Sequence, residues 1–518
     1  MEAHSIEKRP PYGMIAILFI GAFVAILNET LLNIALPSIM AEFDVSPSAV
    51  QWLTNGYMLV NGILIPASAF FIQRFTNKSL FITAMALFTA GTLTAALASS
   101  FGILLVARMI QAAGSAVMMP LLMNVMLTAF PVEKRGTAMG TFGLVMIVAP
   151  AIGPTLSGWI IEHYDWRTLF YIVLPFAVFT LIYAIVKLKN ITPQRAIRLD
   201  ILSIILSSLG FGGLLYGFSS AGESGWNDPS VYGTIIVGAL SVIGLILRQL
   251  RMDDPMLEFR IFKHSMFALS SAISIVLAVA MFSAMILMPI YVQTIRGISP
   301  LDSGLLMLPG ALVMGIMSPI TGRLFDKYGP KLLAITGLFI TIATTYFFSR
   351  LDMETAYGTI MLLYTVRMFG MSMVMMPVMT NGLNQLPIKD NPHGTAMNNT
   401  LQQVSGAIGS ALLITVMNNR TESKATELGE QAMANMDPSA VPSDQAMAEM
   451  QAQIMNEAML SGINFTFFIS TIIAVGALIL ALFMKRVDTT ESQKQQQEMA
   501  MQQAEMQDSQ QTPVPNQS

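Results

Sequence analysis

The sequence predicts an all-α integral membrane protein with fourteen transmembrane helices. Its 518 residues are 54% hydrophobic and only 11% charged, whereas about 25% of the residues in soluble domains are charged. Fourteen apolar runs follow one another along the chain, and each is close to the roughly 20 residues that a helix needs to cross the hydrocarbon layer. The basic residues lie in short clusters between these runs, as in the loops of a membrane protein.

Polar segments separate the predicted spans, which we take in chain order. The first run begins near Gly13, and because no small-residue cleavage site follows it, we interpret it as an uncleaved span and not as a signal peptide. The fourteen predicted spans are 13–37, 49–72, 79–99, 102–128, 136–160, 168–187, 200–219, 231–249, 266–293, 302–323, 331–349, 356–382, 396–418 and 460–484.

The distribution of basic residues predicts the orientation of these spans. An even number of spans places both termini on one side of the membrane. Of the 28 Lys and Arg residues, 21 fall on the side of the N-terminus, five on the opposite side and two, Arg108 and Arg367, within spans. Because cytoplasmic loops are enriched in Lys and Arg, we expect cytoplasmic termini and a multi-pass protein of the bacterial plasma membrane.

An internal repeat divides the chain. Residues 108–140 and 367–399 both contain Arg-Met, then VMMP, then Asn four residues after the proline, then a second proline and GTAM. Shared polar residues in this order indicate two six-helix halves, related by a pseudo-two-fold axis, with two helices inserted between them. In transporters, parallel halves enclose the substrate path and rock against each other.

The repeat and the composition predict the following organisation. The 488–518 segment, rich in Gln, Met and Ser, is too polar to bury a core and is expected to be disordered. The predicted segments are a cytoplasmic N-terminus (1–12), an N-terminal half (13–190), two linker helices (191–262), a C-terminal half (263–487) with an extracellular loop (420–459) that can form a helical hairpin, and the cytoplasmic tail (488–518).

Several motifs resemble the major facilitator superfamily, specifically its fourteen-span drug:proton antiporter branch. The segment VAPAIGPTLSGWI (148–160) is similar to the antiporter motif of that branch, with Gly153, Pro154 and Gly158 in place. ARMIQAAGSA (107–116) resembles its arginine motif, and LNETLLNIALP its span 1 motif. The resemblance covers nearly the whole chain and implies alternating access driven by protons, with control of proton leak by the span 5 motif.

Two departures from the family pattern bear on the site. The loop pattern expected between spans 2 and 3 is altered in residues 67–78 and is retained instead as GRLFDKYGPK (322–331), so a cytoplasmic gate is expected to depend on Arg323, Asp326 and Lys327. The family's usual span 1 aspartate position is occupied by Asn28, and the acid lies one residue later at Glu29. A one-residue shift turns a side chain by about 100° on a helix.

Glu29 is the clear acid within the predicted spans, and Arg108 is its candidate partner. A buried charge near the bilayer centre costs at least ~2.5–3.5 kcal/mol, so ionisable residues within membrane spans usually face a functional cavity. Burial favours the neutral carboxyl and a nearby guanidinium favours the carboxylate, so small changes of geometry would take up and release a proton. Alternatively, Glu29 forms a permanent pair with Arg108, or is a hydrogen-bonded carboxyl that only maintains packing.

Polar and methionine side chains within the spans are candidates for the wall of a substrate cavity. Flexible, polarizable methionine suits a pocket that adapts to varied apolar ligands. Each polar residue is also explained as a contact between helices, and each methionine as core or lipid-facing. The candidates are Asn33, Asn55, Asn61, Met119, Asn124, Met376, Asn381 and Gln402, and further polar candidates are Asn384, Asn398 and Gln403.

These observations predict a proton-coupled secondary exporter of amphipathic, cationic or neutral drugs, with Glu29 as the protonation and substrate site. The alternative is an exporter of an endogenous metabolite, lipid or signalling molecule on the same scaffold. The chain has no cysteine, no paired-carboxylate site and no P-loop, so we expect no enzyme activity, cofactor or metal. The expected partners are a small-molecule substrate, protons and the lipid bilayer, without nucleic acid, and we expect a monomer.

Overall fold

The computed structural model describes residues 12–45, 47–131, 134–188, 190, 200–253, 255–434 and 444–486, and every element within them is a helix. The predicted N-terminus up to residue 11 and the predicted tail 488–518 lie outside the described residues. The α-helices are α1 (Tyr12–Phe43), α2 (Pro47–Arg74), α3 (Asn77–Ala96), α4 (Phe101–Ala129), α5 (Arg135–His163), α6 (Thr168–Lys187), α7 (Ile201–Ser224), α8 (Pro229–Gln249), α9 (Ser265–Ile290), α10 (Pro300–Tyr328), α11 (Pro330–Phe348), α12 (Tyr357–Ser372), α13 (Met375–Asn384), α14 (Asn391–Ala434) and α15 (Asp444–Leu482). Short helical turns occupy Phe259–Lys263, Tyr291–Ile295 and Ile388–Asp390.

These helices confirm the predicted all-α membrane fold. Within the described ranges, 13 helical segments are long and apolar enough to cross a membrane. The remaining predicted span, 136–160, lies within α5, a helix of 29 residues. At 1.5 Å per residue, α5 is roughly 43 Å long, more than the ~30 Å of a hydrocarbon core. With α5, each of the fourteen predicted spans has its helix.

The predicted span 356–382 differs in detail, because it is two helices, α12 and α13, with a break at Met373 and Val374. Pro377 explains the break: it has no N–H to donate to the carbonyl of Met373, and its ring clashes with that carbonyl in a continuous helix. In α13, Pro377 falls in the first turn, where backbone N–H groups have no acceptor within the helix. Its repeat counterpart, Pro120, lies inside an uninterrupted α4.

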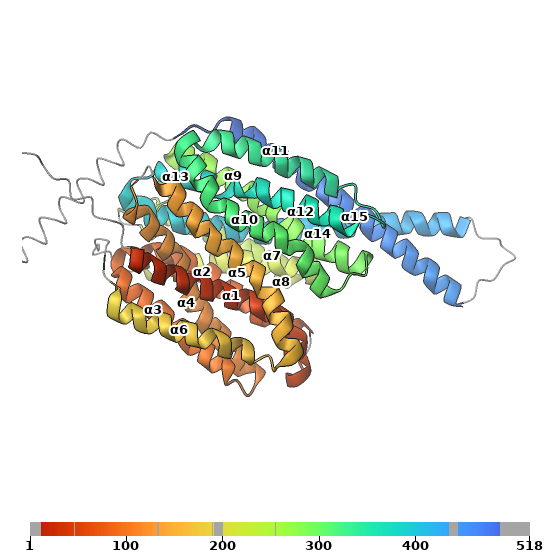
Figure 1. Cartoon of the computed structure of the whole chain (residues 1–518), viewed down its shortest axis with the longest axis horizontal. Helices are drawn as coiled ribbons and strands as arrows, with labels where there is room; N and C mark the ends of the chain where they lie inside the picture. The colour runs from red at the N-terminus through yellow and green to blue at the C-terminus, as the bar shows by residue number, and fades with distance from the viewer. Residues whose placement is uncertain are drawn as a thin grey trace, which may run out of the picture.

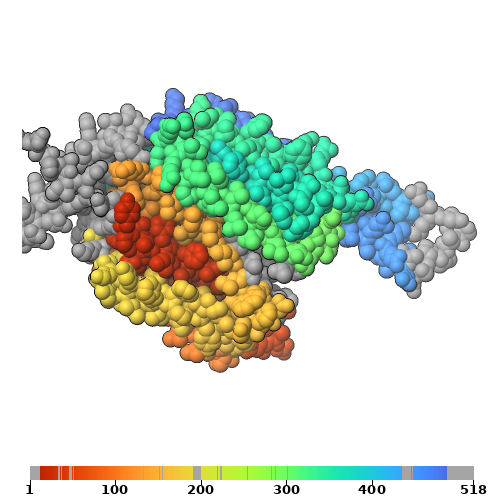
Figure 2. All heavy atoms as spheres, in the orientation of Figure 1, coloured from red at the N-terminus to blue at the C-terminus, as the bar shows by residue number. Residues whose placement is uncertain are grey.

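The spans pack into two bundles, each with its own apolar core. The first core is built mainly by α1 to α6 around fully buried side chains such as Phe81, Phe88 and Phe170. The second core is built by α9 to α12, α14 and α15 around Tyr291, Phe348 and others. Figure 2 shows the two bundles as separate masses, red to yellow for the first and green to blue for the second.

The two inserted helices pack against both bundles through α7. Trp52 of α2 stacks on Tyr216 of α7, with ring centroids 5.7 Å apart. Beyond the end of α7, the indole Nε1 of Trp226 donates to Thr415 Oγ1 of α14 at 2.6 Å. The α7–α8 pair therefore lies beside the line where α2 of the first bundle packs against α14 of the second.

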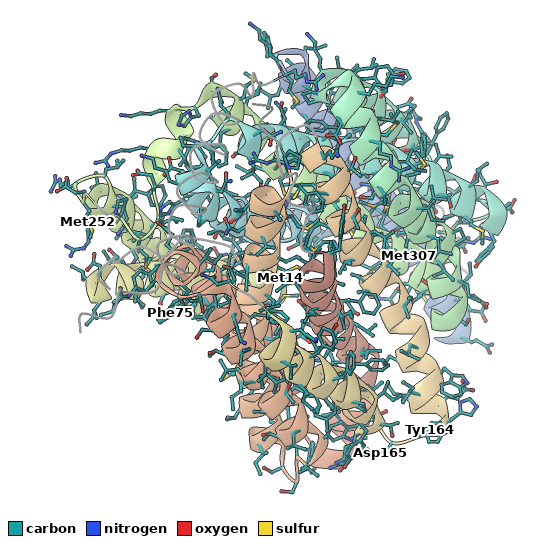
Figure 3. All side chains as sticks on the ribbon, turned by 60° about the vertical axis from the view of Figure 1, so that its left-hand side comes forward. Met14, Phe75, Tyr164, Asp165, Met252 and Met307 are labelled. Atoms are coloured by element: carbon teal, nitrogen blue, oxygen red, sulfur yellow. The ribbon has the colours of Figure 1, made fainter. Side chains whose placement is uncertain are left out.

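The ends of the bundles follow from the connections between helices. Figure 3 shows Tyr164 and Asp165 together at the turn between α5 and α6, away from Phe75 and Met252, which follow α2 and α8. Phe75 and Met252 belong to the side that the basic residues predict to be cytoplasmic. On the other side, α14 and α15 continue beyond the bundle as two long helices (Figure 1), through much of the predicted 420–459 loop.

On the face opposite α7, α5 and α10 form the closest seam between the bundles. A Cβ on Gly136 would lie 2.6 Å from the carbonyl oxygen of Gly322, and a Cβ on Gly140 would overlap the carbonyl oxygen of Ser318. No side chain fits between the two backbones at these positions. Glycine at these positions therefore allows the bundles to close at the predicted cytoplasmic end.

We expect Gly140→Ala to destabilise the protein, because the added methyl group overlaps the Ser318 carbonyl oxygen and overpacking costs about 1–3 kcal/mol. Gly304→Ala is the matched control in α10, since a Cβ there meets nothing within 4 Å. Reversible unfolding in mixed micelles measures both free energies. Equal stability of the two variants would show that the seam is not closely packed.

Candidate functional site

A cavity of about 330 Å³ lies between the two bundles. Helices of both bundles line it: α1, α2, α4 and α5 on one side, and α9, α12, α13 and α14 on the other. Its wall is mainly apolar and rich in thioethers. The methionines that line it are Met58, Met118, Met119, Met146, Met281, Met285, Met371 and Met375.

Glu29, midway along α1, is the one charged side chain among the described residues that line the cavity. It is half-buried. Within the described part of the chain, its carboxyl group accepts no hydrogen bond and has no cation within 4 Å. The site thus presents an unpaired carboxyl to a largely apolar cavity.

Arg108 of α4 is fully buried and is not among the cavity-lining residues. Its Nη1 donates to Gln111 Oε1 at 2.9 Å, and its Nε lies 3.5 Å from the carbonyl oxygen of Leu53. Gln111 donates in turn to Thr92 Oγ1 at 2.8 Å. Among the described residues, Arg108 forms no hydrogen bond or ion pair with Glu29, so the alternative of a permanent Glu29–Arg108 ion pair does not describe this structure.

Three polar side chains beside Glu29 form a connected group on α2 and α4. The hydroxyl of Tyr57 donates to Ser115 Oγ at 2.7 Å, and Ser115 Oγ lies 3.1 Å from Asn61 Oδ1. All three line the cavity. Sequence analysis found Asn61 but missed Tyr57 and Ser115. The four-residue spacing of Tyr57 and Asn61, which places them on one helix face, was the available signal.

The structure places the predicted cavity residues in different surroundings. Asn61, Met119, Gln402 and Gln403 line the cavity with Glu29. Asn399 and Ser274 also line it and were not among the candidates. Asn381 instead donates to the carbonyl oxygen of Lys485 at 3.1 Å. The other candidates absent from the wall are Asn55, Asn124, Met376, Asn384 and Asn398. The side chain of Asn33 lies outside the described residues.

The antiporter motif packs against α1 directly beside Glu29. A Cβ on Gly153 would overlap Thr30 Oγ1, and Ser157 Oγ donates to the carbonyl oxygen of Leu31 at 2.6 Å. Gly158 has open space where a Cβ would lie, and the side chain of Pro154 is outside the described residues. The motif thus determines how closely α5 approaches the helix that carries the carboxyl.

The predicted gate residue Asp326 joins α10 to the start of α5. Its carboxylate accepts from the backbone N–H groups of Gly136 and Thr137, both at 2.9 Å, and from Thr137 Oγ1 at 2.7 Å. Because a helix N-terminus carries partial positive charge, it favours a carboxylate. Arg323 and Lys327 are exposed, and Lys327 lies over the ring of Tyr328. We name Asp326, Gly136 and Thr137 the α5–α10 latch.

A second contact lies at the repeat-related position. Gln73 of α2 occupies the place that Asp326 has in the repeat, and its Nε2 lies 2.9 Å from His393 Nε2 in the first turn of α14. Nearby, Arg135 Nη1 donates to Asn384 Oδ1 at 3.2 Å. These contacts close the predicted cytoplasmic end. Among the residues that line the cavity, Met285, five residues before the end of α9, is 54% exposed.

Comparisons with known proteins agree with this architecture. The Major Facilitator Superfamily model matches residues 18–410, and the chain therefore belongs to this superfamily. This confirms the resemblance and the prediction of a secondary transporter and not an enzyme. The chain is 48% identical to the uncharacterized MFS-type transporter YhcA of Bacillus subtilis (strain 168), over 95% of this chain and 96% of that protein.

Other relatives carry names that refer to drug resistance. The chain is 42% identical to the lincomycin resistance protein LmrB of Listeria monocytogenes, over 94% of this chain and 99% of that protein. It is 24% identical to the tetracenomycin C resistance and export protein of Streptomyces glaucescens, over 94% of both. The human organic anion transporter MFSD10 (TETRAN) shares the fold, with a TM-score of 0.61, 12% identity and coverage of 90% of this chain and 100% of that one.

We expect Asp326→Asn to open the predicted cytoplasmic end, because a neutral amide loses the charge-assisted bonds to the start of α5. The natural chain has no cysteine, so spin labels attached at cysteines replacing Lys187 and Lys331, exposed at the ends of α6 and α11, report the separation of the bundles. The distance distribution should shift toward longer values.

Asp302→Asn is the control for this measurement. Asp302 lies at the opposite end of α10, where its carboxylate accepts from Ser299 of the same turn. This variant should leave the distribution unchanged. If Asp326→Asn also leaves it unchanged, the latch does not hold the bundles together.

Proposed function

We propose that this protein is a proton-coupled exporter of amphipathic drugs, cationic or neutral, that works by alternating access with Glu29 as the shared site for proton and substrate. The observation that supports the proposal most directly is the carboxyl of Glu29, which lacks a bonded partner in the described structure and faces a cavity lined by methionines between the two bundles.

The chemistry of Glu29 favours competition between a proton and a cation. An uncompensated charge at this depth costs at least ~2.5–3.5 kcal/mol, so an ionised Glu29 requires a cation beside it or must take up a proton. A cationic drug and a proton satisfy the same requirement. Binding of one displaces the other, and exchange across the membrane follows when the cavity opens to the two sides in turn.

The cavity wall suits varied apolar ligands. Its volume of about 330 Å³ is within the range of drug-binding pockets, and the flexible thioethers of residues such as Met119 and Met375 can adapt to different shapes. The polar side chains Asn61, Asn399 and Gln402 supply hydrogen bonds for neutral cargo. The printed names of the relatives, which refer to lincomycin, tetracenomycin C and multidrug resistance, support drugs as the cargo.

The contacts between the bundles support alternating access. The α5–α10 latch and the Gln73–His393 contact join the bundles at the predicted cytoplasmic end, and we infer that the cavity opens toward the outer side, where the lining residue Met285 is exposed. In this state a proton enters from outside and drug leaves. We place the protein in the bacterial plasma membrane as a monomer. Both termini lie in the cytoplasm, as the distribution of Lys and Arg predicts.

We expect Glu29→Gln to abolish proton-driven transport of a cationic dye, because the amide neither binds a proton nor neutralises a cation. Everted membrane vesicles are energised to an acidic interior, and ethidium accumulation is followed after addition of nigericin to collapse the pH gradient. The wild-type protein should show gradient-dependent accumulation, and the variant should show a loss of at least tenfold.

Glu42→Gln is the matched control in α1. Glu42 lies near the outer end of the helix, where hydrogen bonds from Arg167 and Trp166 lower the pKa of its carboxyl, and it is remote from the cavity. This variant should retain the gradient dependence. Gradient-driven accumulation that persists in Glu29→Gln would overturn the assignment of Glu29. Its absence in the wild type for several cationic dyes would favour the alternative cargo, an endogenous compound.

A further inference from the structure

We propose that Tyr57 is a positioning residue that controls when Arg108 can reach Glu29, and thereby when the site retains or releases its proton. This inference rests on the proposed function of Glu29. It assigns to Tyr57 the regulation of that site: with the ring between the two charges the carboxyl is free to bind a proton or cation, and with the ring displaced the guanidinium pairs with the carboxylate.

Glu29 has unused hydrogen-bond acceptors, and Arg108 has an unused hydrogen-bond donor. The carboxyl of Glu29 accepts no hydrogen bond from any described residue. Nη2 of Arg108 is buried and has no acceptor among the described residues, although Nη1 and Nε are used. An unmet donor in a buried guanidinium is costly, so a carboxylate oxygen that came within reach would bind it strongly.

The ring of Tyr57 stacks on Arg108 and lines the cavity that Glu29 faces. The guanidinium carbon of Arg108 lies 4.3 Å from the centroid of this ring, a cation–π stack. Tyr57 lines the cavity together with Glu29, whereas Arg108 does not. The ring is only 1% exposed. The ring therefore separates Arg108 from the cavity.

Tyr57 is held in this place by its hydroxyl and by its helix. The hydroxyl donates to Ser115 Oγ. Its helix, α2, packs on α7 through Trp52 and on α14 of the second bundle. Because the bundles rock against each other in such transporters, α2 is one of the helices of this site, with α4 and α5, that contact the moving bundle directly. Movement of α2 along α14 provides a physical means of displacing the ring.

The proton balance of the step is simple. With the ring in place, Glu29 takes a proton from water on the outer side and is neutral. When the ring moves, Arg108 donates a hydrogen bond through Nη2 and remains charged, and Glu29 releases its proton to water on the cytoplasmic side. Tyr57 is the other titratable group of the described cavity wall; α5 presents Ser157 beside Glu29, and α9 and α14 present only neutral side chains to the cavity.

The test measures binding of tetraphenylphosphonium, a cation that does not titrate, to the full-length purified protein in nanodiscs between pH 4 and 9. In the wild type, binding should weaken as the pH falls and Glu29 becomes protonated. Tyr57→Leu should move the midpoint to lower pH by about 1–3 units, the usual effect of an adjacent cation on a carboxyl group. Tyr57→Phe, which keeps the aromatic face, should move it by less than half as much.

Two further variants separate this effect from a general disturbance. In the double variant Tyr57→Leu with Arg108→Gln, the shift to lower pH should disappear, because no guanidinium remains to pair with Glu29. Tyr57→Met also lacks an aromatic face but has a longer, more flexible side chain than leucine, and it should shift the midpoint as Tyr57→Leu does. It serves as the test if Tyr57→Leu does not yield folded protein, as judged by size-exclusion chromatography.

The outcomes distinguish this inference from the proposed function. If Glu29→Gln removes the pH dependence of binding but Tyr57→Leu and Tyr57→Met leave the midpoint unchanged, the role of Tyr57 is wrong and that of Glu29 stands. A shift that persists in the double variant also overturns the inference, because it does not pass through Arg108. If Glu29→Gln leaves the pH dependence intact, the proposed function itself fails.

Discussion

A carboxyl group inside a bilayer must either bind a proton or have a cation beside it, because its low-dielectric surroundings do not solvate a negative charge. Glu29 has no cation bonded to it within the described structure, and the surrounding features depend on this condition. The cavity gives the carboxyl access to a ligand. Arg108 is retained in the same bundle but behind the ring of Tyr57, so the nearest cation does not occupy the site permanently.

The first bundle must also move against the second bundle. The contacts between the two bundles must therefore be stable in one state and able to separate in the other. Backbones in close approach at Gly136 and Gly322 allow dense packing along α5 and α10. Asp326 then adds charge-assisted hydrogen bonds to the first turn of α5. The repeat-related contact uses the neutral Gln73 with His393 instead. The two sides of the predicted cytoplasmic gate are therefore chemically unequal, although the helices that form them are related.

The sequence predicted the site only in part, and the reason is geometric. Glu29 was evident because a carboxylate in an apolar run is exceptional, and its place on the cavity wall agrees with that expectation. Arg108 was its candidate partner, but the position of a residue along its helix does not specify the direction of its side chain. Tyr57 and Ser115 gave no signal by composition, since tyrosine and serine are ordinary in membrane helices. Only the packing of α2 on α4 brought them together.

The sequence by itself determined the fold class and the order of the spans, because apolar length and the positions of Lys and Arg are local properties of a chain in a membrane. It also indicated the repeat, the family and the acid at Glu29. The tertiary structure alone decided that Arg108 stacks on Tyr57 and that Asn381 donates to the carbonyl oxygen of Lys485, beyond the end of α15. It also decided that Pro377 separates two helices where Pro120 does not. These contacts depend on which neighbouring helix each side chain or carbonyl group packs against. The spacing of residues along the chain does not specify that packing.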